Sequence, residues 1–166
     1  VEDDAFLRDA DATTARLRAG LRFEMGDGWT ALVEAEGILD TGDRHNSGAN
    51  GMTTRPAVID PEGAELNQVW IGWKRDRFGA TLGRQRINLD NQRWIGSVGW
   101  RQNEQTYDAG SINYKFNDKL QAYYAYVRQV NRIHGPDNGT PPADFNGNTH
   151  LADLSYTFSP AAKLTA

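Results

Sequence analysis

The sequence predicts an all-β protein, an antiparallel up-and-down transmembrane β-barrel of which about seven to eight strands are visible. Apolar and polar residues alternate over long segments, and the connections between these segments are alternately short and long. The longest apolar run, Ala122–Val127, is far shorter than the roughly 20 residues that a membrane-spanning helix needs. The mean hydropathy of −0.67 and net charge of −4 do not exclude a barrel, because its strands face lipid only at every second residue. The absence of cysteine excludes disulfides and thiolate metal sites.

The first predicted hairpin shows the alternation most clearly. Between residues 16 and 25 every second side chain is apolar, from Leu17 to Met25, and the residues between them are polar or glycine. Strict period two predicts a strand with one apolar face. The Gly-Asp-Gly sequence at 26–28 predicts a tight turn, and residues 29–40 predict the returning strand.

The remaining elements repeat this plan. Residues 41–63 are rich in Gly, Asn, Asp, Thr and Pro without periodicity, which predicts a long loop. The strand predicted at 66–74 has Trp70 on its otherwise polar face. Further strands are predicted at 78–87, 106–116, 119–131 and 149–158, with an eighth strand beginning near the end of the chain; short turns are predicted at 75–77, 117–118 and 159–163, and long loops at 88–104 and 132–148.

The connections predict an orientation in the membrane. Outer-membrane barrels place short turns in the periplasm and long loops outside, whereas soluble sandwiches mix the two kinds. A set of aromatic residues within a few positions of a short turn predicts an interfacial girdle. This set comprises Phe23, Trp29, Trp73, Phe78, Tyr114, Phe116 and Phe158. Aromatic caps on a soluble sandwich core are the alternative interpretation.

The strand directions predict that 1–166 is a single partial domain, an internal slice of a larger barrel. The first strand precedes a short turn and therefore runs from the outside toward the periplasm. Outer-membrane barrels usually begin on the periplasmic side, with a strand that runs in the opposite direction. Residues 1–12 would then end an external loop, and the strand that starts at Lys163 would be unfinished. A closed barrel of about eight strands remains an alternative if either end of the chain forms more strand.

Charged residues share the polar face of several strands. A charge that faces lipid costs about 2–4 kcal/mol near the midplane, so these side chains are expected to line the lumen. They are Arg16, Arg18, Arg22, Glu24, Glu34, Glu36, Arg84 and Arg86. Arginines could attract anionic solutes, because a guanidinium binds a carboxylate through two hydrogen bonds. A self-neutralising ladder of Arg and Glu across neighbouring strands explains the same pattern, and the sequence leaves both interpretations open.

Other chemistry has weaker support. His45, His134 and His150 lie in or beside predicted loops without metal-ligand spacing, which predicts solvated residues. His45-Asn46-Ser47 resembles a nucleophile set only in composition. Calcium binding and turn formation remain alternatives for a group of loop residues. That group comprises Asp40, Asp43, Asp137 and Asn138.

Several segments resemble the alginate-export family of Gram-negative outer-membrane porins. They are 60–68, 82–87, 90–91, 99–109 and 130–133, and the block 100–109 is the most specific. The resemblance covers most of 15–166 and implies a monomeric barrel of about 16 to 18 strands in a bilayer with lipopolysaccharide.

The resemblance also implies a function. In the alginate exporter an Arg-rich pore conducts an acidic polysaccharide. By this resemblance Arg84 and Arg86 would face the lumen, and Arg101 would lie where the second long loop meets its returning strand. The implied solute is anionic, such as a uronate or an alginate-like carbohydrate. No catalysis, cofactor, metal or nucleic-acid partner is implied.

Two other function classes stay open on the sequence alone. One is a soluble β-sandwich that binds carbohydrate through exposed Trp and Tyr residues. The other is a small outer-membrane barrel hydrolase, which requires a histidine to meet a serine and an acidic or amide partner in space.

Overall fold

The computed structural model describes residues 9–42, 44–136 and 141–166. The external loop end predicted for residues 1–12 falls largely outside this range, and so do Asp43, Asp137 and Asn138 of the possible calcium group. Across the residues described, no helix has the length and apolar character needed to span a membrane.

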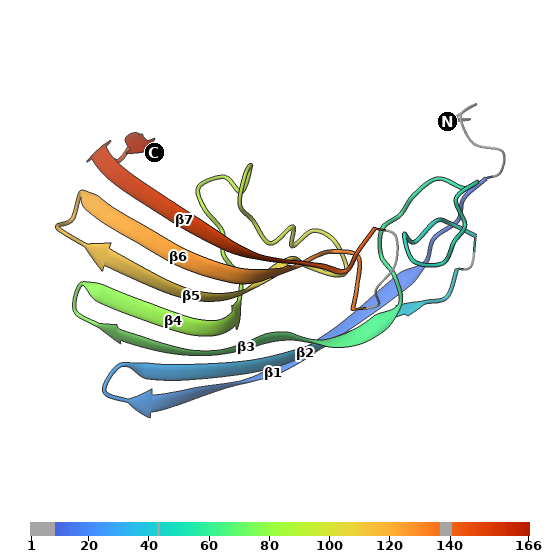
Figure 1. Ribbon diagram of the computed structural model, residues 1–166, viewed down its shortest axis with the longest axis horizontal. Helices are drawn as coiled ribbons and strands as arrows, with labels where there is room; N and C mark the ends of the chain where they lie inside the picture. Colours follow the sequence, from blue (N-terminus) through green and yellow to red (C-terminus); the bar gives the residue numbers. More distant parts are fainter. Residues whose placement is uncertain (1–8, 43, 137–140) are drawn as a thin grey trace.

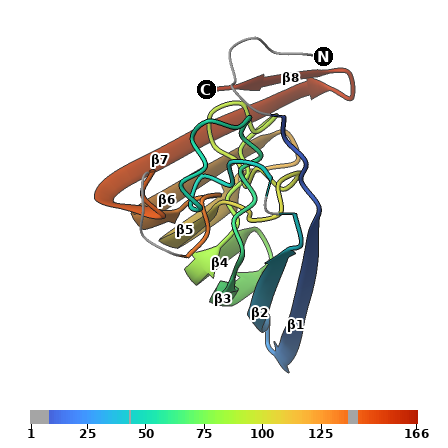
Figure 2. The same ribbon diagram turned by 90° about the vertical axis from the view of Figure 1, so that its right-hand side faces the viewer.

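The chain folds into one eight-stranded antiparallel sheet in which each strand pairs with its neighbours in sequence. The strands are β1 (Thr14–Gly26), β2 (Trp29–Asp40), β3 (Gly63–Arg75), β4 (Phe78–Gln85), β5 (Thr106–Lys115), β6 (Leu120–Asn131), β7 (Asp144–Ser159) and β8 (Ala162–Thr165). Figure 1 shows the short turns together at one end and the long connections at the other. Figure 2 shows that the sheet curves into a trough with the long connections gathered over its concave side. The predicted all-β, up-and-down class is confirmed.

One face of the sheet is apolar and exposed. The register aligns Leu21 with Val33, and Val33 with Val69, so the alternation of each strand continues across its neighbours. Leu17 and Leu82 expose 75% and 66% of their surface. An apolar face of this size needs a lipid or protein environment.

The first turn depends on glycine. Gly28 has a φ of 85°, and a Cβ at this position would lie 2.0 Å from the carbonyl oxygen of Lys74. The Lys74 amide donates to the Gly28 carbonyl oxygen over 2.9 Å, so the β1–β2 turn and β3 are joined through backbone alone. Only glycine allows this conformation and this close approach together.

The second loop (86–105) folds back onto the concave face of the sheet. Ile87 packs with inward side chains of β5 and β6, which are Tyr107, Ala109, Ala125 and Val127. This buried cluster lies between the second loop and the concave face of the sheet. The apolar side chains of the opposite face stay exposed and contribute nothing to it. The loop thereby occupies the concave side beside β4–β7 (Figures 1 and 2).

Several predicted strand boundaries were wrong, and β3 begins at Gly63 and not at Leu66. β7 begins at Asp144 and not at Thr149, because its first residues pair with the polar end of β6 and carry no apolar alternation. β4 ends at Gln85 and not at Ile87. Gly83 adopts a φ of 123° beside the Val69 carbonyl, which breaks the alternation, and Ile87 then enters the buried cluster.

Candidate functional site

An ion-pair cluster joins three elements on the concave face. We use this name for Arg18 of β1, Glu34 and Glu36 of β2, and Arg86 and Glu104 of the second loop. Arg18 Nε donates to Glu36 over 2.6 Å, and its Nη1 lies 3.5 Å from Glu104 Oε2. Arg86 donates to Glu104 over 2.6 Å and to Glu34 over 3.0 Å. The second loop therefore supplies one cation and one anion to a pairing that begins on the sheet.

Two amides of β3 complete the cluster. Asn67 Nδ2 donates to Glu34 over 2.8 Å and to Glu104 over 2.5 Å, and Gln68 Nε2 donates to Glu34 over 3.0 Å. Two neighbouring residues of a strand normally point to opposite faces. Here the β2–β3 register shifts between Glu34 and Ala35, so Asn67 is an extra residue and both amides reach the same carboxylate.

A second ion pair lies between β4 and β5. Arg84 binds Asp108 through two hydrogen bonds of 2.7 and 3.0 Å, and Asn131 of β6 donates to the same carboxylate over 3.1 Å. Arg84 also donates to the Leu66 carbonyl oxygen over 3.1 Å. This geometry is the two-bonded guanidinium–carboxylate pair, which fixes orientation as well as charge.

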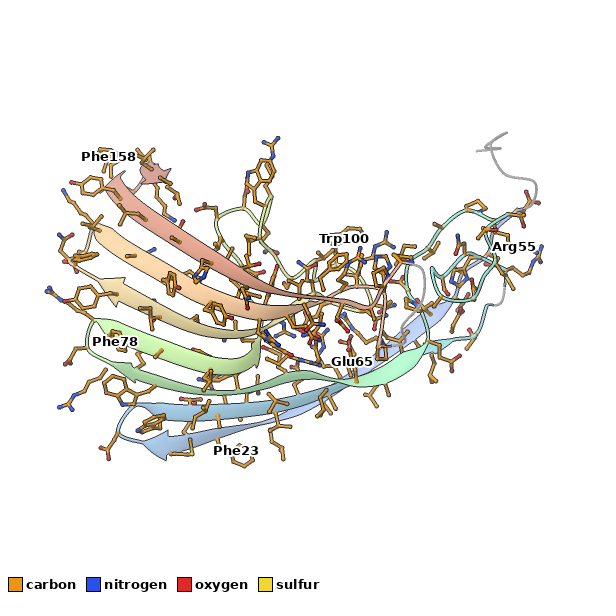
Figure 3. The ribbon with its side chains drawn as sticks, in the orientation of Figure 1. Phe23, Arg55, Glu65, Phe78, Trp100 and Phe158 are labelled. Carbon is orange, nitrogen blue, oxygen red and sulfur yellow. The ribbon has the colours of Figure 1, made fainter. Side chains whose placement is uncertain are left out.

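The segments that resemble the export family converge at these pairs. The Gln102 amide donates to Asp60 over 3.1 Å, and Asn103 donates to the Pro61 carbonyl oxygen over 3.2 Å. Figure 3 shows Glu65 and Trp100, from two of these segments, at a distance from Phe78 and Phe158 at the short-turn end. Residues spread over much of the sequence thus build one polar network under the second loop.

Each arginine of this network has a carboxylate partner. Arg18 pairs with Glu36, Arg84 with Asp108 and Arg86 with Glu104. Of the two interpretations of the sequence, this geometry corresponds to the cross-strand ladder of arginines and carboxylates.

The other residues that were predicted to line the lumen lie outside the ion-pair cluster. Arg16 donates to the carbonyl oxygens of Arg101 and Gln102 over 2.9 and 3.0 Å, which ties β1 to the second loop. The Arg101 guanidinium stacks over the Trp100 ring at 4.5 Å. Arg22 pairs with Glu24 over 2.7 Å near the first turn, where both side chains are more than half exposed. The structure therefore does not bring these four charges into the ion-pair cluster.

The aromatic residues near the short turns form a row along the apolar face. Trp29 and Trp73 lie 6.4 Å apart, and Trp73 and Phe78 lie 5.9 Å apart, between ring centroids. Phe78 is in register with Tyr114, whose ring contacts Phe116 edge to face at 4.9 Å. Phe23 and Phe158 are 49% and 58% exposed on the outlying strands β1 and β7.

A second aromatic group on the apolar face escaped the sequence analysis. Tyr124 and Tyr126 of β6 flank His150 of β7, and the Tyr124 hydroxyl lies 2.7 Å from His150 Nδ1. The alternation of β6 had placed both tyrosines on one face. What the sequence could not show was the register that places His150 beside them.

Glu104, Asn67 and Asp108 are among the polar residues that could not be singled out from the sequence. Glu104 and Asn67 are 3% and 1% exposed. Glu104 and Asp108 lie in the block 100–109, the most specific part of the family resemblance, which was the signal available for them. The inward position of Asn67 depends on a β-bulge, which no sequence pattern predicts.

The histidines differ in their surroundings. His45 was predicted to be solvated, but it is fully buried, with Nε2 3.5 Å from Asp40 Oδ2. Burial and the neighbouring charge of Arg132 lower the pKa of His134, which favours its neutral form. Within the described parts of the chain, no group of His, Asp and Glu has the geometry to hold a metal ion.

Comparisons with known proteins agree with this architecture. The family model described as alginate export matches residues 2–130. The crystal structure of OccAB4 from Acinetobacter baumannii, an outer-membrane β-barrel, superimposes with a TM-score of 0.67 at 16% sequence identity. The match covers 96% of this chain and 44% of that chain, so this chain spans less than half the length of that structure. No curated protein matches the chain.

Proposed function

Since the chain belongs to the alginate export family, we propose that it forms part of the wall of a β-barrel channel in the outer membrane of a Gram-negative bacterium. The observation that carries this proposal is the division between the two faces of the sheet. The aliphatic side chains are exposed on one face, and the other holds a charged network and an inward loop. Family and fold point to a channel rather than to an enzyme.

The apolar face is proposed to contact lipid, including lipopolysaccharide in the outer leaflet. The predicted girdle would mark the periplasmic interface, and Tyr124, Tyr126 and His150 the outer one. Phe158 and His150 are about 26 Å apart along β7, at about 3.3 Å per residue. A tilt of about 40° reduces this separation to about 20 Å in height, close to the apolar band of about 25 Å that barrels show.

The second loop is proposed to narrow the channel. Ile87 anchors it on the concave face, and Arg16 holds its far end through the carbonyl oxygens of Arg101 and Gln102. A loop fixed at both ends on the inner wall reduces the open cross-section of a barrel. It also brings the partly exposed side chain of Arg86 toward any solute that passes.

The proposed solute is an anionic carbohydrate, such as a uronate or an alginate-like polymer, carried by a monomer. The family description and the arginines on the concave face support this solute. The carboxylate partners of Arg18, Arg84 and Arg86 balance much of their charge. Selectivity would therefore depend on the local field at the loop and on cations outside these pairs.

Planar-bilayer recordings of the full-length protein test this proposal. Discrete conductance steps with an anion-selective reversal potential are expected. Arg84→Ala and Arg86→Ala should shift the reversal potential toward cations, whereas Arg75→Ala at the short-turn end serves as the matched control. A cation-selective channel that both variants leave unchanged would contradict the anionic solute, and absence of channel activity would contradict the function itself.

A further inference from the structure

Two glutamates lie directly opposite each other on neighbouring strands. The register pairs Arg18 with Glu36 and Glu36 with Glu65, so the three side chains form a row across β1, β2 and β3 on the concave face. Residues opposite each other in an antiparallel pair have Cβ atoms about 4.5–5.5 Å apart, and two like charges there destabilise the sheet. Glu65 lies in the half of the sheet next to the long connections (Figure 3). The pair of glutamates therefore requires a compensating cation or a bound proton.

The arginines of the ion-pair cluster are already shared among other carboxylates. Arg18 Nε donates to Glu36 over 2.6 Å, and its Nη1 lies 3.5 Å from Glu104 Oε2. Arg86 donates to Glu104 over 2.6 Å and to Glu34 over 3.0 Å. Two guanidinium groups thus serve three carboxylates, which leaves no cation of the cluster for a fourth.

Glu65 has no partner of its own. Within the parts of the chain that the structure describes, its carboxylate forms neither a hydrogen bond nor an ion pair. The Oε1 atom of Glu36 also lacks a hydrogen-bond donor, although the side chain of Glu36 is fully buried. A buried acceptor without a donor costs free energy. A proton on Glu65 supplies the missing donor, because a protonated carboxyl donates through its O–H group.

Water can reach the Glu65 carboxyl. Glu65 lines a cavity of about 180 Å³ on the concave face, between β3, β4 and the outer ends of β6 and β7. A water molecule needs about 10–15 Å³ of such space, so the cavity has room for several. The charged groups around Glu65 come from six neighbouring segments and are Arg18 of β1, Glu36 of β2, Arg84 of β4, Glu104 of the second loop, Arg132 after β6 and Asp144 of β7.

The other arginines around the cavity are bound elsewhere. Arg84 is held by Asp108 through two hydrogen bonds. Arg132 donates to the Pro142 carbonyl oxygen over 2.8 Å, and its guanidinium lies 4.4 Å from a phenylalanine ring of β7. Their charges therefore do not replace a direct partner for Glu65. Partial burial and a carboxylate on the opposite strand both favour the uncharged form of a carboxyl group.

We propose that Glu65 holds a proton at neutral pH and that its ionisation sets the charge selectivity of the channel. The protonated carboxyl donates to Glu36 Oε1, and the row across β1–β3 then holds one carboxylate against one arginine. At alkaline pH the proton passes to the water of the cavity, and the concave wall gains a negative charge without a cation partner. The inference rests on the proposed channel function and identifies the residue that makes its anion preference depend on pH.

Reversal potentials of the full-length protein in planar bilayers, measured at about pH 6 and about pH 9, test this role. Glu65→Gln keeps the shape and a donor of the protonated side chain but cannot ionise. Wild type and Glu65→Gln should have the same anion-to-cation permeability ratio at about pH 6. At about pH 9 the wild-type ratio should be about threefold lower, the effect of one charge about 7 Å from an ion in water.

Glu24→Gln is the matched control. Glu24 also lies on the polar face of its strand, but it is paired with Arg22 and 66% exposed, and an ordinary glutamate is ionised at both pH values. This variant should differ from wild type by the same factor at both. The same behaviour in Glu65→Gln would overturn the proposal, and so would a Glu65→Gln channel equal to wild type at both pH values.

Infrared spectroscopy of the protein in lipid vesicles gives a readout that does not depend on conductance. At neutral pH the wild-type spectrum should contain the carbonyl stretch of a protonated carboxyl group, which Glu65→Gln should lack and Glu24→Gln should keep. Absence of this difference would overturn the bound proton. Its presence in a protein without channel activity would overturn the selectivity role and contradict the proposed function, while the proton on Glu65 would stand.

Discussion

Replacing Glu104 with alanine is predicted to destabilise the folded protein and to release the second loop. The Glu104 carboxylate is 3% exposed and accepts hydrogen bonds from Arg86 and Asn67. It also lies 3.5 Å from Arg18 Nη1. Alanine leaves two guanidinium groups and one amide with fewer acceptors in a site shielded from water.

The magnitude follows from the burial of the partners. Removing one member of a buried ion pair costs about 3–5 kcal/mol. Arg86 is 32% exposed, so water screens part of its charge, and Arg86 and Arg18 keep Glu34 and Glu36 as partners. We therefore expect a loss of about 2–3 kcal/mol in the free energy of unfolding.

Urea titration of the full-length protein in phospholipid vesicles, followed by tryptophan fluorescence, measures this loss. Glu24→Ala is the matched control, since Glu24 also pairs with an arginine but is 66% exposed, and no measurable change is expected there. The two variants should also differ in bilayer recordings, with more current noise for Glu104→Ala. Equal stability of the two variants would refute the assignment of Glu104 as a buried member of the ion-pair cluster.

Three further substitutions probe other parts of the fold. Leu21→Arg should lower the unfolding free energy by about 2–4 kcal/mol in lipid vesicles because it places a charge on the apolar face, whereas Arg22→Leu should not. Ile87→Ala should cost about 2–4 kcal/mol and raise single-channel conductance, because the second loop loses its 2% exposed anchor. Gly28→Ala should reduce the yield of heat-modifiable folded protein on gels, since its Cβ would overlap the Lys74 carbonyl oxygen; unchanged yield would contradict the tight-turn geometry.

The sequence was most informative where lipid is expected to contact the chain. β1 was predicted from strict alternation and β2 from a less regular one, and the register Leu21 to Val33 confirms that their apolar residues share a face. β7 was shortened in the prediction because Asp144 to Asn148 carry no such alternation. These residues pair with the polar end of β6, where neither face is uniformly apolar, so period two has no signal there.

The polar network could be predicted only in part. Arg18 and Glu36 face each other because adjacent strands in register bring together residues of the same face. Glu104 reaches them only because its loop folds inward, and that fold depends on contacts between Ile87 and β5 and β6, which are distant in sequence. Asn67 depends on a one-residue bulge. Neither long-range packing nor a β-bulge produces a periodic pattern in the sequence from which it could be predicted.

Site-directed spin labelling along β1 tests the central claim most directly, and the 166 residues of this chain contain no cysteine that would compete for the label. Labels at positions 21 to 24 in the full-length protein would be measured for collision with lipid-soluble oxygen and with a water-soluble nickel chelate. We predict that positions 21 and 23 collide with oxygen and positions 22 and 24 with the chelate. Access of the chelate to all four positions would contradict a sheet that separates lipid from an aqueous lumen.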